Sequence, residues 1–194
     1  MKNILFTLIL LGSGTIFSLQ AQIEITPAED LPDLLAQVDL TKDVNATFFE
    51  VWQLPIFEEL AKTEARVITI LTGTMKVMKL PVETTFLHQV GTYNHQGLQK
   101  LNDRLVVSGS SSKTEALMAS AELEEHQILF LEKALEHTED VDVILLYDRI
   151  RSISKDNLRD IVAELFKEGV AYRPVAMSDQ YFDMQVMIEA APVF

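Results

Sequence analysis

The strongest constraint on the fold of this chain is the spacing of its apolar residues, which recur at steps of three and four over long stretches. In the segment 55–78, such a stripe contains Phe57, Leu60, Leu71 and Met75. This period places the apolar residues on one face of a helix. No stretch alternates apolar and polar residues for long enough to make a convincing sheet strand. The sequence therefore predicts an all-α protein.

Helix-breaking residues divide the chain into long helices. We expect helices over residues 28–52, 55–78, 113–136 and 139–167. A shorter helix carries Leu98, Leu101 and Leu105 inside the long crossover 79–112, and an extension with a short terminal helix follows from Tyr172 to Phe182. One long crossover is typical of the ferritin-like variant of the four-helix bundle. The predicted fold is thus an all-α, ferritin-like four-helix bundle with a crossover helix and a C-terminal extension.

The first residues have the layout of a secretory signal peptide. Lys2 precedes the apolar run 4–11, and small residues around Ala21 offer a cleavage site. The run is too short to span a bilayer, which takes about 20 apolar residues. We predict a signal peptide over 1–21 and a single helical domain over 22–194. The product is expected to be periplasmic or secreted.

Composition excludes several classes of function. The net charge of −13 argues against a nucleic-acid partner, and against membrane association once the signal peptide is removed. The chain has no cysteine, so burial alone must stabilise it. Gly-x-Ser-x-Gly turns, phosphate loops and dinucleotide fingerprints do not occur in the sequence. The sequence is compatible with a homo-oligomer and with a protein partner, and it does not identify either.

Two glutamates interrupt the apolar stripes. Glu64 lies in the stripe of 55–78 and Glu124 in that of 113–136. In ferritin-like di-metal bundles, two helices each contribute a Glu and two contribute Glu-x-x-His, and all of these side chains point inward. Glu64 and Glu124 stand where such ligands would be. Gln37 and Asn157 occupy the centres of the first and fourth helix faces, and Val67 follows Glu64 by three residues.

Several ordered motifs resemble the ferritin-like bacterial family known as domain of unknown function 2202. The run Phe49–Glu64 (FEVWQLPIFEELAKTE) resembles its Trp-Gly-Leu-Pro-x-Phe turn and the following Ser-Glu-x-x-His. The segments 98–110 and 121–125 resemble its short middle helix and its Glu-Glu helix. Tyr172 to Phe182 is similar to its C-terminal extension. The resemblance covers roughly residues 31–187.

The departures from this family fall on the metal ligands that the resemblance implies. Gln37 stands at or beside the first-helix Glu, while Val67 and Asn157 replace the two histidines. The retained ligands would be Glu64 and Glu124, or Glu125 if the register shifts by one residue. We predict that no di-iron centre assembles and that no cofactor is bound. A polar cluster is expected instead, with these members: Gln37, Thr41, Glu64, Glu124 and Asn157.

The leading hypothesis is an exported ferritin-like protein without enzymatic activity and without catalytic residues. The alternative is a metal-dependent oxidase, or a metal-binding or storage protein, with a rearranged iron or manganese site. Its ligands would be Glu64, Glu124 and Glu125, with Gln37 and Asn157 as weak oxygen donors.

Overall fold

A computed structural model describes residues 27–82 and 90–187 of the chain. The predicted signal peptide lies outside these residues. The described elements are α1 (Pro27–Trp52), α2 (Pro55–Val77), α3 (Gln96–Gly109), α4 (Lys113–His137), α5 (Val141–Lys167), α6 (Asp179–Tyr181) and the π-helical turn η2 (Phe182–Met187). No strand occurs in the described residues, so the all-helical prediction is confirmed. The long helices begin and end within two residues of the predicted bounds.

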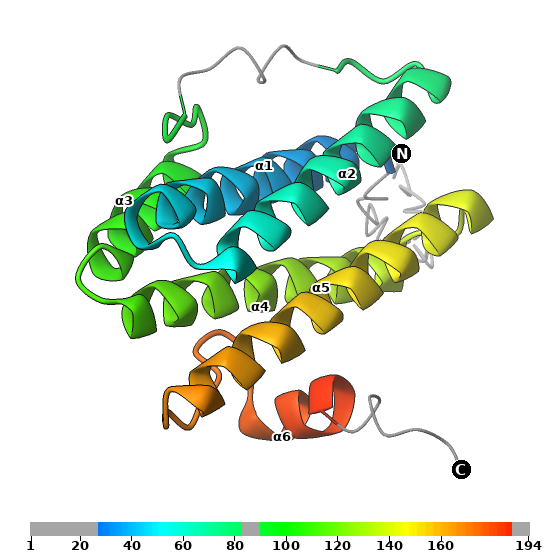
Figure 1. The fold of residues 1–194 in the computed structure, drawn as a ribbon. Coiled ribbons are helices and arrows are strands. Elements are labelled where there is room, and N and C mark those ends of the chain that lie inside the picture. Colours follow the sequence, from blue (N-terminus) through cyan, green and yellow to red (C-terminus); the bar gives the residue numbers. More distant parts are fainter. Residues whose placement is uncertain (1–26, 83–89, 188–194) are drawn as a thin grey trace, which may run out of the picture.

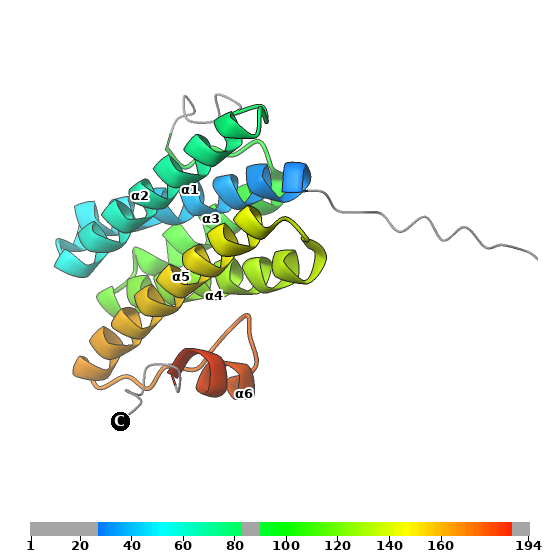
Figure 2. The same cartoon turned by 90° about the vertical axis from the view of Figure 1, so that its right-hand side faces the viewer.

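The long helices form two antiparallel hairpins that pack face to face (Figure 1). Helices α1 and α2 make one hairpin, and α4 and α5 make the other. Helix α1 lies against α4, and α2 lies against α5. Helix α3 packs on the outside of α1 and α4, and the C-terminal elements lie below α4 and α5 in Figure 2. The two hairpins together enclose the interior in which Glu64, Glu124 and Asn157 are buried.

Side-chain caps and a proline fix where the long helices begin. Ser112 accepts a hydrogen bond from the backbone N–H of Glu115 at 3.1 Å at the start of α4. Asp140 accepts from Val143 N at 3.2 Å at the start of α5. Pro55 opens α2, where its missing N–H costs no intrahelical hydrogen bond. The two side-chain caps satisfy backbone N–H groups in the first turns of α4 and α5.

One tight corner joins α1, α3 and α4. The indole Nε1 of Trp52 donates to the carbonyl of Gly109 at 2.8 Å. A Cβ on Gly109 would lie 2.2 Å from the ring of Phe48, so the end of α3 approaches α1 too closely for any side chain. Glycine at this position therefore sets the distance at which α3 packs.

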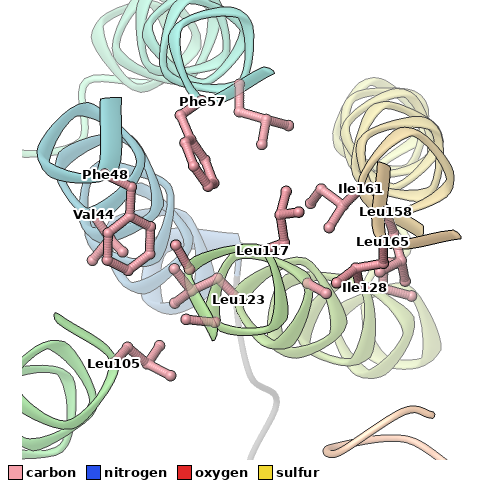
Figure 3. Close-up of a cluster of buried hydrophobic side chains, with 14 of the residues drawn as sticks. Val44, Phe48, Phe57, Leu105, Leu117, Leu123, Ile128, Leu158, Ile161 and Leu165 are labelled. Carbon is pink, nitrogen blue, oxygen red and sulfur yellow. The ribbon is translucent and has the colours of Figure 1, made fainter. Parts of the chain in front are cut away.

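The apolar core consists of two clusters along the bundle. The first contains Phe48, Phe57 and Leu117, shown with their neighbours in Figure 3. The second contains Leu34, Val67, Leu71, Tyr147 and Ile150, among others. No helix among residues 27–82 and 90–187 combines the length and apolarity that crossing a membrane would take.

Candidate functional site

A layer of buried polar side chains lies where the two apolar clusters meet. In α2, Glu64 lies between Leu60 of the first cluster and Val67 of the second. In α5, Ser154 and Asn157 lie between Ile150 of the second cluster and Leu158 of the first. The helical period that buries the apolar residues therefore also points these polar groups inward. We call the set Glu64, Glu124, Gln127, Ser154 and Asn157 the polar layer.

Asn157 joins the two carboxyl groups of the polar layer. Its amide Nδ2 donates to Glu64 Oε1 at 3.0 Å and to Glu124 Oε1 at 3.1 Å. Glu64 and Glu124 are both 0% exposed. The structure therefore brings together three residues singled out from the sequence, from three different helices, around one amide group.

Gln127 and Ser154 complete the layer. The amide Nε2 of Gln127 donates to the hydroxyl of Ser154 at 2.7 Å. Hydrogen bonding from Gln127 lowers the pKa of Glu64, and that from Ser154 lowers the pKa of Glu124, so both side chains adjoin the carboxyl groups. Gln127 was missed from the sequence. It follows Glu124 by three residues on the same helix face, which is the spacing that could have revealed it.

Burial makes the two carboxyl groups poor acids. Desolvation raises the pKa of Glu64 to about 8, against the smaller opposing effects of the Gln127 and Asn157 hydrogen bonds. Desolvation, and then repulsion from Glu64, raises the pKa of Glu124 well above its ordinary value. At neutral pH the pair therefore favours retaining a proton over carrying two negative charges.

Three oxygen atoms of the layer have no hydrogen-bond partner among the described residues. They are Glu64 Oε2, Glu124 Oε2 and the amide oxygen of Gln127. A buried polar atom without a partner costs free energy, so an unpaired group in a native protein needs an explanation. The layer has acceptor capacity that the described side chains do not use.

The structure does not bring Gln37 and Thr41 into the hydrogen bonds of the polar layer. Both line a separate hollow of about 360 Å³ between α1, α3 and α4. The Thr41 hydroxyl donates to the Gln37 carbonyl of its own helix at 3.1 Å. A different α1 residue, Asn45, makes the buried polar contact with α4, because Ser120 donates to its Oδ1 at 2.7 Å. Thr41 and Asn45 are four residues apart and lie on the same side of α1, so the helical period alone does not show which of them contacts α4 through a hydrogen bond.

Val67 extends the apolar packing up to the layer. It is 1% exposed and belongs to the second apolar cluster, with Leu71 and Ile150. Its side chain offers no donor or acceptor, so the position three residues after Glu64 contributes only packing.

Glu125 points to a different place and holds the C-terminal segment. Its carboxylate accepts from Val175 N at 3.0 Å, from Met177 N at 3.0 Å, and from Ala176 N and the Tyr172 hydroxyl. It is 0% exposed, and these donors satisfy it. Glu125 therefore ties the segment after α5 to α4 and does not face Glu64.

The sequence matches the uncharacterized protein domain DUF2202 over residues 34–190. The chain belongs to this family. The family assignment suggested by the Trp52–Phe57 turn and the later motifs is thus confirmed. The DUF2202 match spans α1 to η2 and so includes every residue of the polar layer.

A protein similar to this chain has been solved as a crystal structure. The uncharacterized protein MJ0754 of Methanocaldococcus jannaschii is 24% identical to this chain over 155 residues, which are 80% of this chain and 83% of the relative. The crystal structure of the hypothetical protein MJ0754 superposes with a TM-score of 0.78, covering 84% of this chain and 92% of that one. At 24% identity this likeness establishes a shared fold. It assigns no activity to the chain.

Proposed function

We propose that this chain is an exported, non-enzymatic protein of ferritin-like architecture, in which a hydrogen-bonded carboxyl pair replaces a di-metal centre. The observation that carries the proposal is the Asn157 amide, which donates to Glu64 at 3.0 Å and to Glu124 at 3.1 Å. The amide occupies the space between the carboxyl groups that metal ions would need. In this proposal the helical bundle keeps its architecture, and the Asn157 contact with the two carboxyl groups stands in place of a redox centre.

The side chains of the layer do not suit two metal ions. Di-metal carboxylate bundles use bridging carboxylates together with an imidazole for each ion. Here the positions three residues after Glu64 and Glu124 are Val67 and Gln127, and the α5 position is Asn157. Two carboxylates and two amides cannot neutralise and coordinate two divalent ions as four carboxylates and two imidazoles do. The mismatch supports a role in binding or interaction in place of oxygen chemistry.

Metal content tests this proposal. The full chain is expressed in medium supplemented with iron or manganese, purified without chelator, and measured by inductively coupled plasma mass spectrometry. We expect fewer than two ions per chain. The variant carrying Val67→His and Asn157→His, which restores two imidazoles facing Glu64 and Glu124, is expected to retain more metal than the wild type. Two ions per wild-type chain would refute the proposal.

The second candidate is a metal-dependent oxidase or storage protein with a rearranged site. The unpaired oxygens of Glu64, Glu124 and Gln127 favour it, because they are acceptors without donors. Anaerobic loading with Fe²⁺ followed by exposure to oxygen separates the two candidates. An absorption band of an oxygen-bridged di-ferric centre would establish the second candidate, whereas our proposal expects no such band.

A further inference from the structure

We propose that the hollow between α1, α3 and α4 binds a free medium-chain carboxylate, with its alkyl chain inside and its carboxylate at Lys133. The hollow lies on the flank where α3 packs against α1 and α4 (Figure 1). Its volume of about 360 Å³ falls within the range of about 300–1,000 Å³ that small-ligand sites have. The hollow is separate from the polar layer, so the inference goes beyond the proposed function and does not depend on metal binding.

Leucine and phenylalanine side chains form most of the wall of the hollow. Leu40 and Leu123 are only 1% and 2% exposed and form its floor. The other apolar side chains of the wall are only partly buried, so water reaches them when the hollow is empty of ligand. An alkyl chain would cover these side chains and remove its own surface from water, and both effects favour binding. The partly buried members are Leu98, Leu101, Leu129 and Phe130.

The hollow is elongated along α4. Leu123 and Lys133 both line it and are ten residues apart, which corresponds to about 15 Å along the helix axis. An extended medium-chain alkyl group has a length of this order, and the volume suits one such chain. A single-chain amphiphile therefore fits the dimensions of the hollow.

The polar groups of the hollow give the ligand a direction. Thr41 is 1% exposed, and its hydroxyl already donates to the Gln37 carbonyl at 3.1 Å, so the inner part of the hollow asks for no polar ligand atom. Lys133 is exposed and stands where α4 meets solvent. An alkyl chain therefore belongs inside the hollow, and a solvated head group belongs beside Lys133.

The charges around the hollow favour an anionic head group. The ammonium group of Lys133 forms no ion pair or hydrogen bond with any residue that the structure describes. The described side chains that line the hollow include no carboxylate. Glu122 lies nearby, 3.6 Å from His126 Nε2, but Arg104 Nη1 donates to it at 3.0 Å and balances its charge.

This positive end is a local exception in a chain with a net charge of −13. Charges more than about 8–10 Å away are largely screened at physiological ionic strength, so the nearby ammonium group decides which head group is favoured. One lysine without a partner suits a group with a single negative charge, such as a carboxylate.

Calorimetric titration of the purified full chain with decanoate, octanoate and 1-decanol tests the inference, with each compound kept below the concentration at which it aggregates. We expect one decanoate per chain. Octanoate should bind about tenfold more weakly, because each buried methylene contributes about fourfold. The neutral 1-decanol should bind more weakly than decanoate.

Two variants locate the site. Lys133→Met keeps an unbranched apolar stem without the charge, and should weaken decanoate binding by about threefold to fivefold and remove the preference over 1-decanol. Leu98→Trp places a large ring in the hollow and should abolish binding. The matched control is Lys113→Met, an exposed lysine of the same helix, which should bind decanoate as the wild type does.

The failures of this inference are distinct from those of the proposed function, which depends on metal content. No decanoate binding at millimolar concentration would overturn the inference, as would equal affinity of the wild type for decanoate and 1-decanol. Undiminished binding in Lys133→Met and Leu98→Trp chains, confirmed as folded by circular dichroism, would also overturn it. The same holds if the wild type is a dimer that Leu98→Trp dissociates, because a second copy of the chain would then cover the hollow.

Discussion

Asn157 is the residue on which the polar layer depends most, because it alone donates to both buried carboxyl groups. Asn157→Leu keeps the approximate side-chain size and removes both hydrogen bonds. We expect a loss of about 3 kcal/mol in the free energy of unfolding, since two buried acceptors lose their donor. Asp160→Asn, at an exposed position of the same helix, is the control and should change stability by less than about 0.5 kcal/mol. Urea unfolding measures both, and equal stability of the two variants would contradict the assignment.

The raised pKa of Glu64 makes the stability of the fold depend on pH. Burial raises its pKa to about 8, so the folded chain retains a proton that the unfolded chain has released. The contribution of Glu64 to stability is therefore greatest below the ordinary glutamate pKa and is lost as pH rises towards about 8.

We expect Glu64→Gln, which is permanently neutral, to reduce this fall by an amount on the order of a few kcal/mol. Thermal unfolding from pH 5 to pH 8.5, in chelator, measures the effect. Glu50→Gln, at an exposed position of α1, should leave the pH dependence as in the wild type. A wild-type curve that rises over this range would contradict the protonated pair.

At the scale of elements, Glu125 controls the C-terminal segment. Three backbone N–H groups, of Val175, Ala176 and Met177, and the Tyr172 hydroxyl converge on its carboxylate. Glu125→Gln replaces a charge-assisted acceptor with a neutral amide whose NH₂ group faces donors. We expect faster amide hydrogen exchange across residues 170–187 and a loss of about 2 kcal/mol. Exchange in α1 should stay unchanged, and uniform acceleration along the chain would contradict a local anchor.

The position of α3 depends on Gly109. A Cβ there meets the Phe48 ring at 2.2 Å and the Ala116 Cα at 3.1 Å. Gly109→Ala is expected to destabilise the chain by roughly 1–3 kcal/mol through overpacking. Phe48→Leu in the same chain removes the ring and should recover part of that loss. A double-mutant cycle by chemical unfolding measures the coupling, and additive effects would contradict the contact.

The long helices could be predicted from the sequence because each carries its own period, proline or cap. It was harder to predict in which direction each side chain of a helix points. The helical period placed Glu64, Glu124 and Asn157 correctly, since each is surrounded by apolar neighbours on the same face. The helical period also grouped Gln37 and Thr41 with these residues, because the apolar residues of α1 cover a wide part of its surface. One side of that apolar surface faces α3, and Gln37 and Thr41 lie there. The role of Glu125 depends on residues fifty positions later, and no local pattern reveals it.

At the scale of the whole molecule, the bundle is two apolar clusters joined by one polar layer. An apolar core would be simpler to pack, and an unpaired polar layer costs stability. The family match over residues 34–190 shows that the framework belongs to DUF2202, but the activity of that family is uncharacterized. The physical question is therefore what the layer holds, and our account answers that it does not hold two metal ions.

The most direct measurement is anomalous X-ray scattering at the iron edge from crystals of the full chain soaked anaerobically in Fe²⁺. A di-metal centre gives two peaks about 3.5–4 Å apart. Our account predicts no pair of anomalous peaks between Glu64 and Glu124, with the Asn157 side chain still against the two carboxyl groups. Two peaks between Glu64 and Glu124 would contradict it.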